Sequence, residues 1–159
     1  MNRGIEIVHE FGRHAAVTTF DFHPGQAGDR IPEAFRTVAA YLGAAGVPAT
    51  GGAIGVYRMG PAGMTASVGF EVDQEIPGDG PVEPLTIAAG DTLRTLHVGP
   101  YERLPETYDA LRSFAARHDL RLDEHVMWEE YRSHPEVEPG LTETVVHWPC
   151  TRVPSRVTR

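Results

Sequence analysis

The spacing of apolar residues predicts two amphipathic helices, one in each half of the chain. Residues 30–46 and 103–119 both carry apolar side chains three or four positions apart, which places them on one helical face. A proline near the start of each segment fits the first helical turn, while Gly46 and Asp119 suit the left-handed backbone that ends a helix. The faces consist of Ile31, Phe35, Val38 and Leu42 in the first segment, and of Leu104, Tyr108, Leu111 and Ala115 in the second.

Alternating apolar and polar residues predict three strands in each half. One strand precedes each helix and two follow it, with turns rich in Gly and Pro between them. The order strand, helix, strand, strand therefore occurs twice. The predicted strands cover residues 14–22, 55–58 and 64–72 in the first half, and 92–98, 129–132 and 142–148 in the second.

The two halves also share residues at a constant offset. Arg30, Pro32 and Glu33 recur 73 positions later in the second helix, and the run Tyr57-Arg58 recurs 74 positions later. This agreement predicts a tandem duplication within a single domain. The repeats cover about residues 4–73 and 83–150, and residues 74–82 join them.

One such unit is too small to bury a stable core by itself. Two units can pair edge to edge, so the predicted fold is α+β, an antiparallel sheet with both helices on one face. A ligand cleft is expected between the repeats, because interfaces of this kind are common ligand sites.

Composition excludes several classes of chemistry. Acidic residues outnumber basic ones by 22 to 14, which gives a net charge of −8 that disfavours direct binding to nucleic acid. All basic residues are Arg, so neither a Schiff base nor a phosphate-binding P-loop, each of which needs Lys, is expected. The eight His show no metal-binding spacing, and Cys150 is interpreted as a structural thiol. We expect no metal and no cofactor.

No apolar run is long enough for a membrane span, and the N-terminal residues lack the apolar core of a signal peptide. A cytoplasmic location without membrane contact is therefore the expectation.

Several short motifs in the second half resemble the GyrI-like family of small-molecule effector-binding domains. They are the turn Gly99-Pro100-Tyr101, the strand Glu129-Glu130-Tyr131 followed by His134-Pro135, and a last strand that ends at Pro149. The resemblance covers nearly the whole chain. No helix-turn-helix precedes the first strand, which begins near Gly4, so a stand-alone form is expected. The first half departs from the pattern, because Gly55 stands where the acid would be.

The resemblance implies that Glu129 points into the cleft beside Tyr131. Strand alternation then puts Glu130 on the opposite face. An acid among aromatic rings attracts a flat, hydrophobic cation, and each ring adds about 0.5–2 kcal/mol through cation–π contact. Tyr57, Phe70 and Trp148 are candidate walls of the cleft. Tyr101 and His97 either line the cleft or fix the adjacent turn.

Three functions remain open at this point. The first is a multidrug-type protein that binds small aromatic or cationic ligands. The second, also implied by the resemblance, is a hydrolase for reactive cyclopropane-type electrophiles, with Glu129 as general base and Tyr131 orienting the substrate. The third is an inhibitor that interacts with DNA gyrase, although no segment of the sequence indicates a protein partner.

Overall fold

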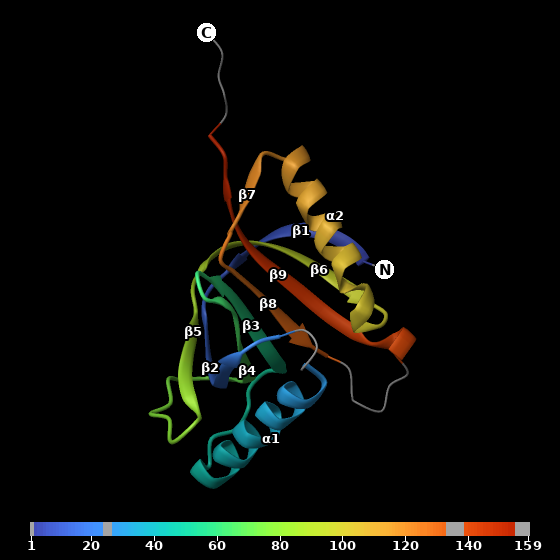
Figure 1. Cartoon of the computed structure of the whole chain (residues 1–159). Coiled ribbons are helices and arrows are strands. Elements are labelled where there is room, and N and C mark those ends of the chain that lie inside the picture. The colour runs from blue at the N-terminus through green and yellow to red at the C-terminus, as the bar shows by residue number, and fades with distance from the viewer. Residues whose placement is uncertain (1, 24–26, 133–138, 155–159) are drawn as a thin grey trace.

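The computed structural model describes residues 2–23, 27–132 and 139–154. Strands dominate these ranges, with two α-helices and two short 3-10 helices between them (Figure 1). The elements are β1 (Asn2–Glu10), β2 (Arg13–Asp21), α1 (Ala27–Ala45), β3 (Ala53–Gly60), β4 (Gly63–Val72), β5 (Glu83–Ile87), β6 (Gly90–Val98), η2 (Tyr101–Arg103), α2 (Leu104–Arg117), β7 (Leu120–Leu122), β8 (Val126–Tyr131), η3 (Pro139–Leu141) and β9 (Glu143–Arg152).

The strands form one antiparallel sheet in the order β1-β6-β9-β8-β3-β4-β2-β5, and β7 pairs with the end of β9. Helix α1 packs against β2 and β4, whereas α2 packs against β6, β7 and β1. Both helices cover the same face of the sheet, which we call the helix face and which carries Tyr57, Glu129 and Val146. The α+β fold with two helices on one face is confirmed.

Two short links force the sheet to roll up. Strands β1 and β2 lie six strand spacings apart in the sheet order, roughly 29 Å in a flat sheet. Only residues 11 and 12 join them, and three Cα–Cα steps reach at most about 11 Å. Residues 88 and 89 join β5 to β6 across the same number of strands. The two edges must therefore approach each other at this end of the sheet.

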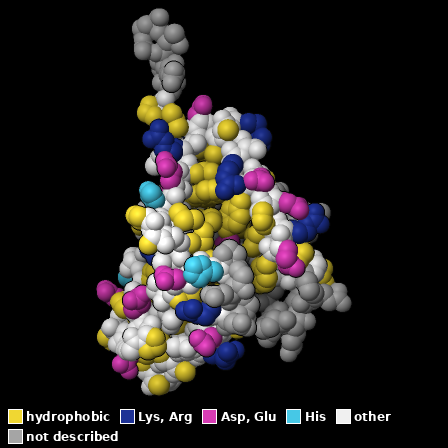
Figure 2. Space-filling view, in the orientation of Figure 1, with side chains coloured by type: hydrophobic (Ala, Val, Ile, Leu, Met, Phe, Trp, Pro, Cys, Tyr) yellow, Lys and Arg dark blue, Asp and Glu magenta, His cyan; other side chains and the backbone are white. Residues whose placement is uncertain are grey.

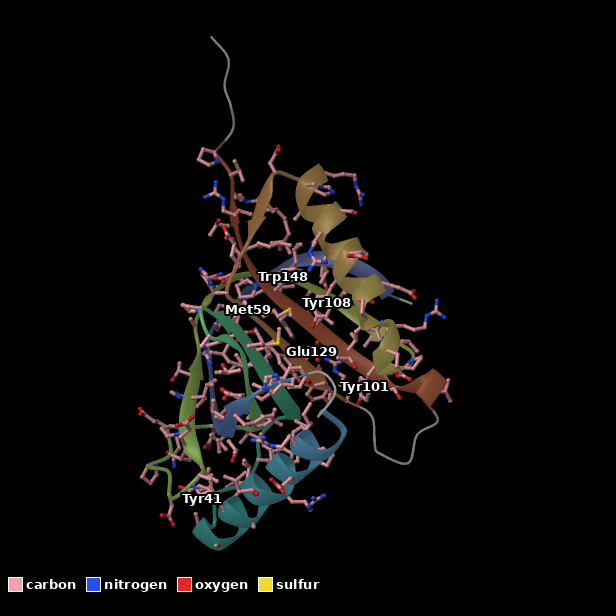
Figure 3. The ribbon with its side chains drawn as sticks, viewed as in Figure 1. Tyr41, Met59, Tyr101, Tyr108, Glu129 and Trp148 are labelled. Atoms are coloured by element: carbon pink, nitrogen blue, oxygen red, sulfur yellow. The ribbon has the colours of Figure 1, made fainter. Side chains whose placement is uncertain are left out.

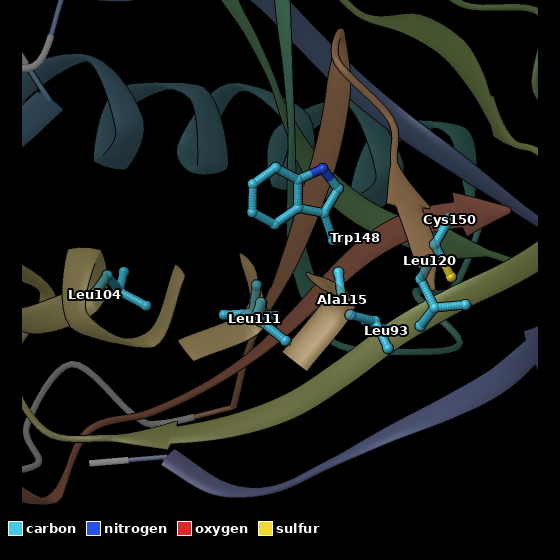
Figure 4. Packing of buried hydrophobic residues seen from close by; sticks show 8 residues of the cluster. Leu93, Leu104, Leu111, Ala115, Leu120, Trp148 and Cys150 are labelled. Carbon is cyan, nitrogen blue, oxygen red and sulfur yellow. The ribbon is translucent and has the colours of Figure 1, made fainter. Parts of the chain in front are cut away.

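This curvature explains a buried cluster on the face that carries no helix, which we call the opposite face. Ile54 and Trp128 are almost fully buried there, together with Val17, Val56 and Ile87. Side chains of neighbouring strands cover one another because the sheet is rolled. On the helix face, α2 supplies Leu104, Leu111 and Ala115 to a cluster with Leu93 and Trp148 (Figure 4).

The helix boundaries agree with the sequence except at one end. Gly46 and Asp119 follow the two helices with φ of 71° and 53°, as predicted. Pro105 lies in the first turn of α2. Helix α1, however, begins at Ala27, so Pro32 lies in its second turn and removes one backbone hydrogen bond there. Placing Pro32 in the first turn was wrong.

The strand predictions identified the central strands and missed weaker ones. The predicted strands correspond to β2, β3, β4, β6, β8 and β9, while β5 and β7 were not predicted and β1 was not separated from β2. Strand β5 is a sheet edge that contains Pro84, and β7 has three residues. The step His134-Pro135 lies outside the described residues. The duplication stays a prediction. The strand order agrees with it, because β8, β9 and β6 follow one another on one side of the β8–β3 pair as β3, β4 and β2 do on the other.

Candidate functional site

The candidate site lies where the two halves of the sheet meet, at the antiparallel pair β3 and β8. Gly55 on β3 is directly opposite Glu129 on β8. Tyr57 and Tyr131 stand two residues along their strands from this pair, on the same face. The position without a side chain in the first half thus faces the acid of the second half.

Two phenols hold the Glu129 carboxylate, one for each oxygen. Tyr108, on α2, donates a hydrogen bond to Oε2, and Tyr131 donates to Oε1 at 2.8 Å. Only 6% of Glu129 is exposed. A carboxylate buried to this extent requires such donors, because burial without hydrogen bonds costs several kcal/mol.

Tyr57 and Tyr101 complete a group of four tyrosines around this acid. The hydroxyls of Tyr57 and Tyr131 lie 2.5 Å apart, and the ring of Tyr101 meets that of Tyr131 edge to face at 6.2 Å. Tyr101 is 50% exposed and stands at the solvent side of the group. Four of the chain's five tyrosines therefore gather at one carboxylate.

Figure 3 shows Glu129, Tyr101 and Tyr108 in the space between the two helices, and Tyr41 far from them. The surface of this face is hollowed at its centre, where hydrophobic side chains gather (Figure 2). The site therefore combines an apolar surface with one buried acid.

The electrostatics follow from burial. Burial raises the pKa of Glu129 above its usual value, while the hydrogen bonds from Tyr108 and Tyr131 act in the opposite direction. Burial, and then the charge of Glu129, raise the pKa of Tyr108 and Tyr131 well above that of an ordinary phenol. Both tyrosines consequently remain hydrogen-bond donors throughout the neutral range.

Gly55 provides the space that this arrangement needs. A Cβ at this position would lie 2.8 Å from the hydroxyl of Tyr131 and 3.0 Å from that of Tyr57. Any larger residue would displace the tyrosine pair. The departure of the first half from the repeated pattern thus has a steric reason.

Two other residues expected to line the cleft lie one layer further out. Phe70 packs against Phe35, whose ring in turn meets Tyr131 at 6.1 Å. Trp148 meets Tyr108 edge to face at 5.7 Å and donates its indole N–H to the Asp123 carbonyl. Both rings lie behind the tyrosines, Trp148 in direct contact with Tyr108 and Phe70 through Phe35.

His97 is held by the turn next to the site. It is fully buried, and its ring nitrogens lie 2.7 Å from Thr107 Oγ1 and 3.1 Å from the Pro100 carbonyl oxygen. These contacts tie β6 to η2 and α2, and so hold Tyr101 in place. Of the two alternatives, these contacts favour the structural role, and the assignment of His97 as a ligand-binding residue stays a prediction.

Sequence reasoning missed two polar groups of the site. Tyr108 was recognised only as part of an apolar helical face, although a phenol at such a position needs a partner for its hydroxyl. Thr144 pairs with Tyr131 across β9 and β8, and its buried Oγ1 has no hydrogen-bond partner among the described residues. It offers a further polar contact beside the tyrosines.

Glu130 lies on the opposite face, as alternation predicts, and belongs to a separate ionic cluster. It lies 3.2 Å from the guanidinium of Arg13 and 2.5 Å from Nε2 of His147. Arg13 also binds Glu10 and Glu71. Burial opposes ionisation of Glu130, but the bond from His147 and the charge of Arg13 outweigh it and lower its pKa to about 2.

Metal sites and membrane-spanning helices are two further features that the described residues can be compared with. Among residues 2–23, 27–132 and 139–154, no three His, Cys, Asp or Glu side chains are grouped to hold a metal ion. Neither helix of this part of the chain has the length and apolar character of a membrane span.

The sequence of residues 5–149 matches the model of the GyrI-like small molecule binding domain, nearly the entire chain. The chain belongs to the GyrI-like family. GyrI-like domains bind small molecules, which agrees with an acid and four tyrosines gathered beside a hollow. No curated protein sequence matches the chain.

Solved structures share the fold of this GyrI-like chain at low sequence identity. The EcmrR C-terminal domain superposes with a TM-score of 0.73 at 15% identity, covering 94% of this chain and 98% of that domain. A hydrolase from Listeria innocua gives 0.68 at 14% identity, with 94% and 92% covered. SAV2435, solved with tetraphenylphosphonium bound, gives 0.61 at 11% identity, with 94% of each chain covered.

Proposed function

We propose that this GyrI-like domain binds hydrophobic, aromatic cations at the tyrosine group around Glu129. The observation that carries the proposal is the buried carboxylate with four of the chain's five tyrosines around it. The low dielectric strengthens the attraction of Glu129 for a cation, and ring faces add about 0.5–2 kcal/mol each.

Tyr108 and Tyr131 satisfy the Glu129 carboxylate with one hydrogen bond to each oxygen. A delocalised cation does not have to replace these hydrogen bonds. The Glu129 carboxylate attracts its charge across several ångströms, because the low dielectric constant of the buried site screens the interaction poorly. Tyr101, half exposed, is the residue an entering ligand meets first. Such a site selects charge and aromatic character and places few demands on shape.

The similarity to SAV2435 supports the ligand class, since that protein was solved with an aromatic phosphonium cation. Its identity of 11% establishes only a common fold, so the argument for this chain depends on its own residues.

Calorimetric titration with tetraphenylphosphonium tests the proposal. We expect one saturable site in the wild type and an affinity at least tenfold lower in Glu129→Gln, because the variant keeps the side-chain shape and loses the charge. Glu102→Gln is the matched control, since this exposed acid lies beside Tyr101 and changes the net charge equally. Equal affinity in Glu129→Gln and Glu102→Gln would rule out Glu129 as the selecting charge.

Hydrolysis is the second candidate. A carboxyl whose pKa is raised by burial is suited to accept a proton from an attacking water, and the Tyr131 hydroxyl beside it could orient an electrophile. The test is incubation with a cyclopropane-type electrophile and mass analysis of the product. Repeated turnover that is lost in Glu129→Gln would support catalysis by this chain. Product limited to one equivalent per chain would rule out catalysis of this substrate and indicate that the chain only binds or traps it.

A further inference from the structure

The opposite face of the sheet contains a second cavity, separate from the tyrosine group. Its volume is about 960 Å³, and it lies at the end where the sheet edges approach each other, between the β5–β6 link and the turn before β8. Val56, Trp128 and Val126 belong to its apolar lining. These residues alternate with Tyr57 and Glu129 along β3 and β8, so the cavity and the tyrosine site lie on different faces.

Two buried polar groups of this cavity lack partners. The indole N–H of Trp128 and the hydroxyl of Thr92 make no hydrogen bond within the described residues, although the two residues are 1% and 3% exposed. Buried polar atoms are almost always paired, so two unpaired ones in the lining of a single cavity indicate that it receives a molecule with acceptor atoms.

Three arginines at the cavity offer hydrogen-bond donors to an anion. Arg58, Arg121 and Arg152 line it, all three are exposed, and none forms an ion pair with another described residue. Three acids line it as well.

Two of these three acids are already engaged. Asp91 lies 3.3 Å from His9, and Asp123 accepts the backbone N–H groups of His125 and Val126 in its own turn. Glu124 is the third. The three acids keep their charges and balance the three arginines, so an anion is favoured only through the guanidinium groups, which make no ion pair with a described residue.

We propose that this cavity is a binding site for small aromatic anions, such as aryl sulfonates or carboxylates. The rings lie against Val56, Val126 and the edge of the Trp128 indole, since His147 stacks on this indole and Arg13 lies over its ring. The anionic group accepts hydrogen bonds from Arg58 and Arg121. Guanidinium is the preferred donor for sulfonates and carboxylates, because its planar N–H groups bind two oxygens at once. This chain then has two sites of opposite charge preference on the two faces of one sheet.

The first test uses 8-anilinonaphthalene-1-sulfonate and the neutral N-phenyl-1-naphthylamine, which carries the same rings. We expect the sulfonate to bind saturably and at least tenfold more tightly than the amine. The double variant Arg58→Gln/Arg121→Gln should lower the sulfonate affinity about tenfold. Arg36→Gln/Arg117→Gln, which removes two exposed arginines of the helices, should leave it unchanged. Equal affinities of the two double variants, or of the two dyes, would overturn the proposal.

The second test locates the dye by the two tryptophans. Trp128 lines this cavity, whereas Trp148 contacts Tyr108 on the helix face. In Trp148→Phe, the sulfonate should quench Trp128 emission with the same midpoint as its own fluorescence increase. Glu129→Gln should bind the sulfonate as the wild type does. Loss of sulfonate binding in Glu129→Gln would place the dye at the other site and contradict the proposal. The outcome is independent of whether the tyrosine site binds cations.

Discussion

At the scale of single residues, the chain separates two adjacent acids by strand alternation. Glu129 is buried among phenols with a raised pKa, and Glu130 is ion-paired with a pKa of about 2. The difference comes from their partners, because phenols stabilise a carboxylate less than a guanidinium does. One strand thus carries an acid with a raised pKa and an ion-paired acid side by side.

The raised pKa of Glu129 predicts the pH dependence of cation binding. Affinity should increase as pH rises through the folded-state pKa of this carboxyl, which burial raises above its usual value. Tyr108→Phe removes a bond that favours the ionised form, so it should move the midpoint to higher pH. Titration of a fluorescent cation across pH 4–9 measures both midpoints. Tyr41→Phe, remote from the site, serves as the control, and identical midpoints in the two variants would refute the role of Tyr108.

The raised pKa of Glu129 also makes the free energy of unfolding depend on pH. A carboxyl with a raised folded-state pKa favours folding when protonated, and this contribution is lost as pH rises through that pKa. Glu129→Gln should therefore be more stable than the wild type at pH 7, by about 0.5–2 kcal/mol, as is common when a functional site is relieved. Thermal unfolding at pH 4 and pH 7 tests this, and a variant less stable than the wild type at pH 7 would contradict it.

At the scale of elements, the β3–β8 pair defines the site. Sequence reasoning identified both strands, because Tyr57 and Tyr131 occur in matching runs with alternating neighbours. It also placed Glu129 and Tyr131 on one face. It could not identify Tyr108 as a donor, since that bond joins α2 to a strand 21 residues away and depends on tertiary packing.

A substitution at Gly55 tests whether the hydroxyls of Tyr57 and Tyr131 need the space that this glycine leaves. Gly55→Ala should lower the free energy of unfolding by about 1–3 kcal/mol, because its Cβ would meet both hydroxyls at 3.0 Å or less. Cation affinity should fall as well. Gly52→Ala is the control, since a Cβ there meets its nearest atom at 3.8 Å. Chemical denaturation and calorimetry measure the two effects, and an unperturbed Gly55→Ala would refute the steric account.

At the scale of the whole molecule, two-residue links roll the sheet and create its two different faces. Neither the rolling nor the missed edge strands follow from local periodicity, because the strand order depends on pairings between distant segments. The Arg13 cluster was missed for the same reason. Glu10, Arg13, Glu71, Glu130 and His147 lie on five strands or turns, and only the fold brings them together.

Arg13 holds this rolled end together and should control acid stability. Glu130, with a folded-state pKa of about 2, contributes stability above pH 4.5 that is lost as pH falls toward 2. Arg13→Gln leaves partly buried acids without their cation, so it should lower the free energy of unfolding at pH 7 by about 3 kcal/mol. Denaturation at pH 7 and pH 3 measures this. A loss of the same size at both pH values would argue against the ionic origin.

The central claim is that the charge of Glu129 selects cations, and two ions of equal shape and opposite charge test it most directly. Tetraphenylphosphonium and tetraphenylborate differ in the sign of one charge. The account predicts that the wild type favours the cation at least tenfold at the helix-face site, measured by competition with a bound fluorescent cation, and that Glu129→Gln reduces this preference at least tenfold. An unchanged ratio of the two affinities in Glu129→Gln would contradict it.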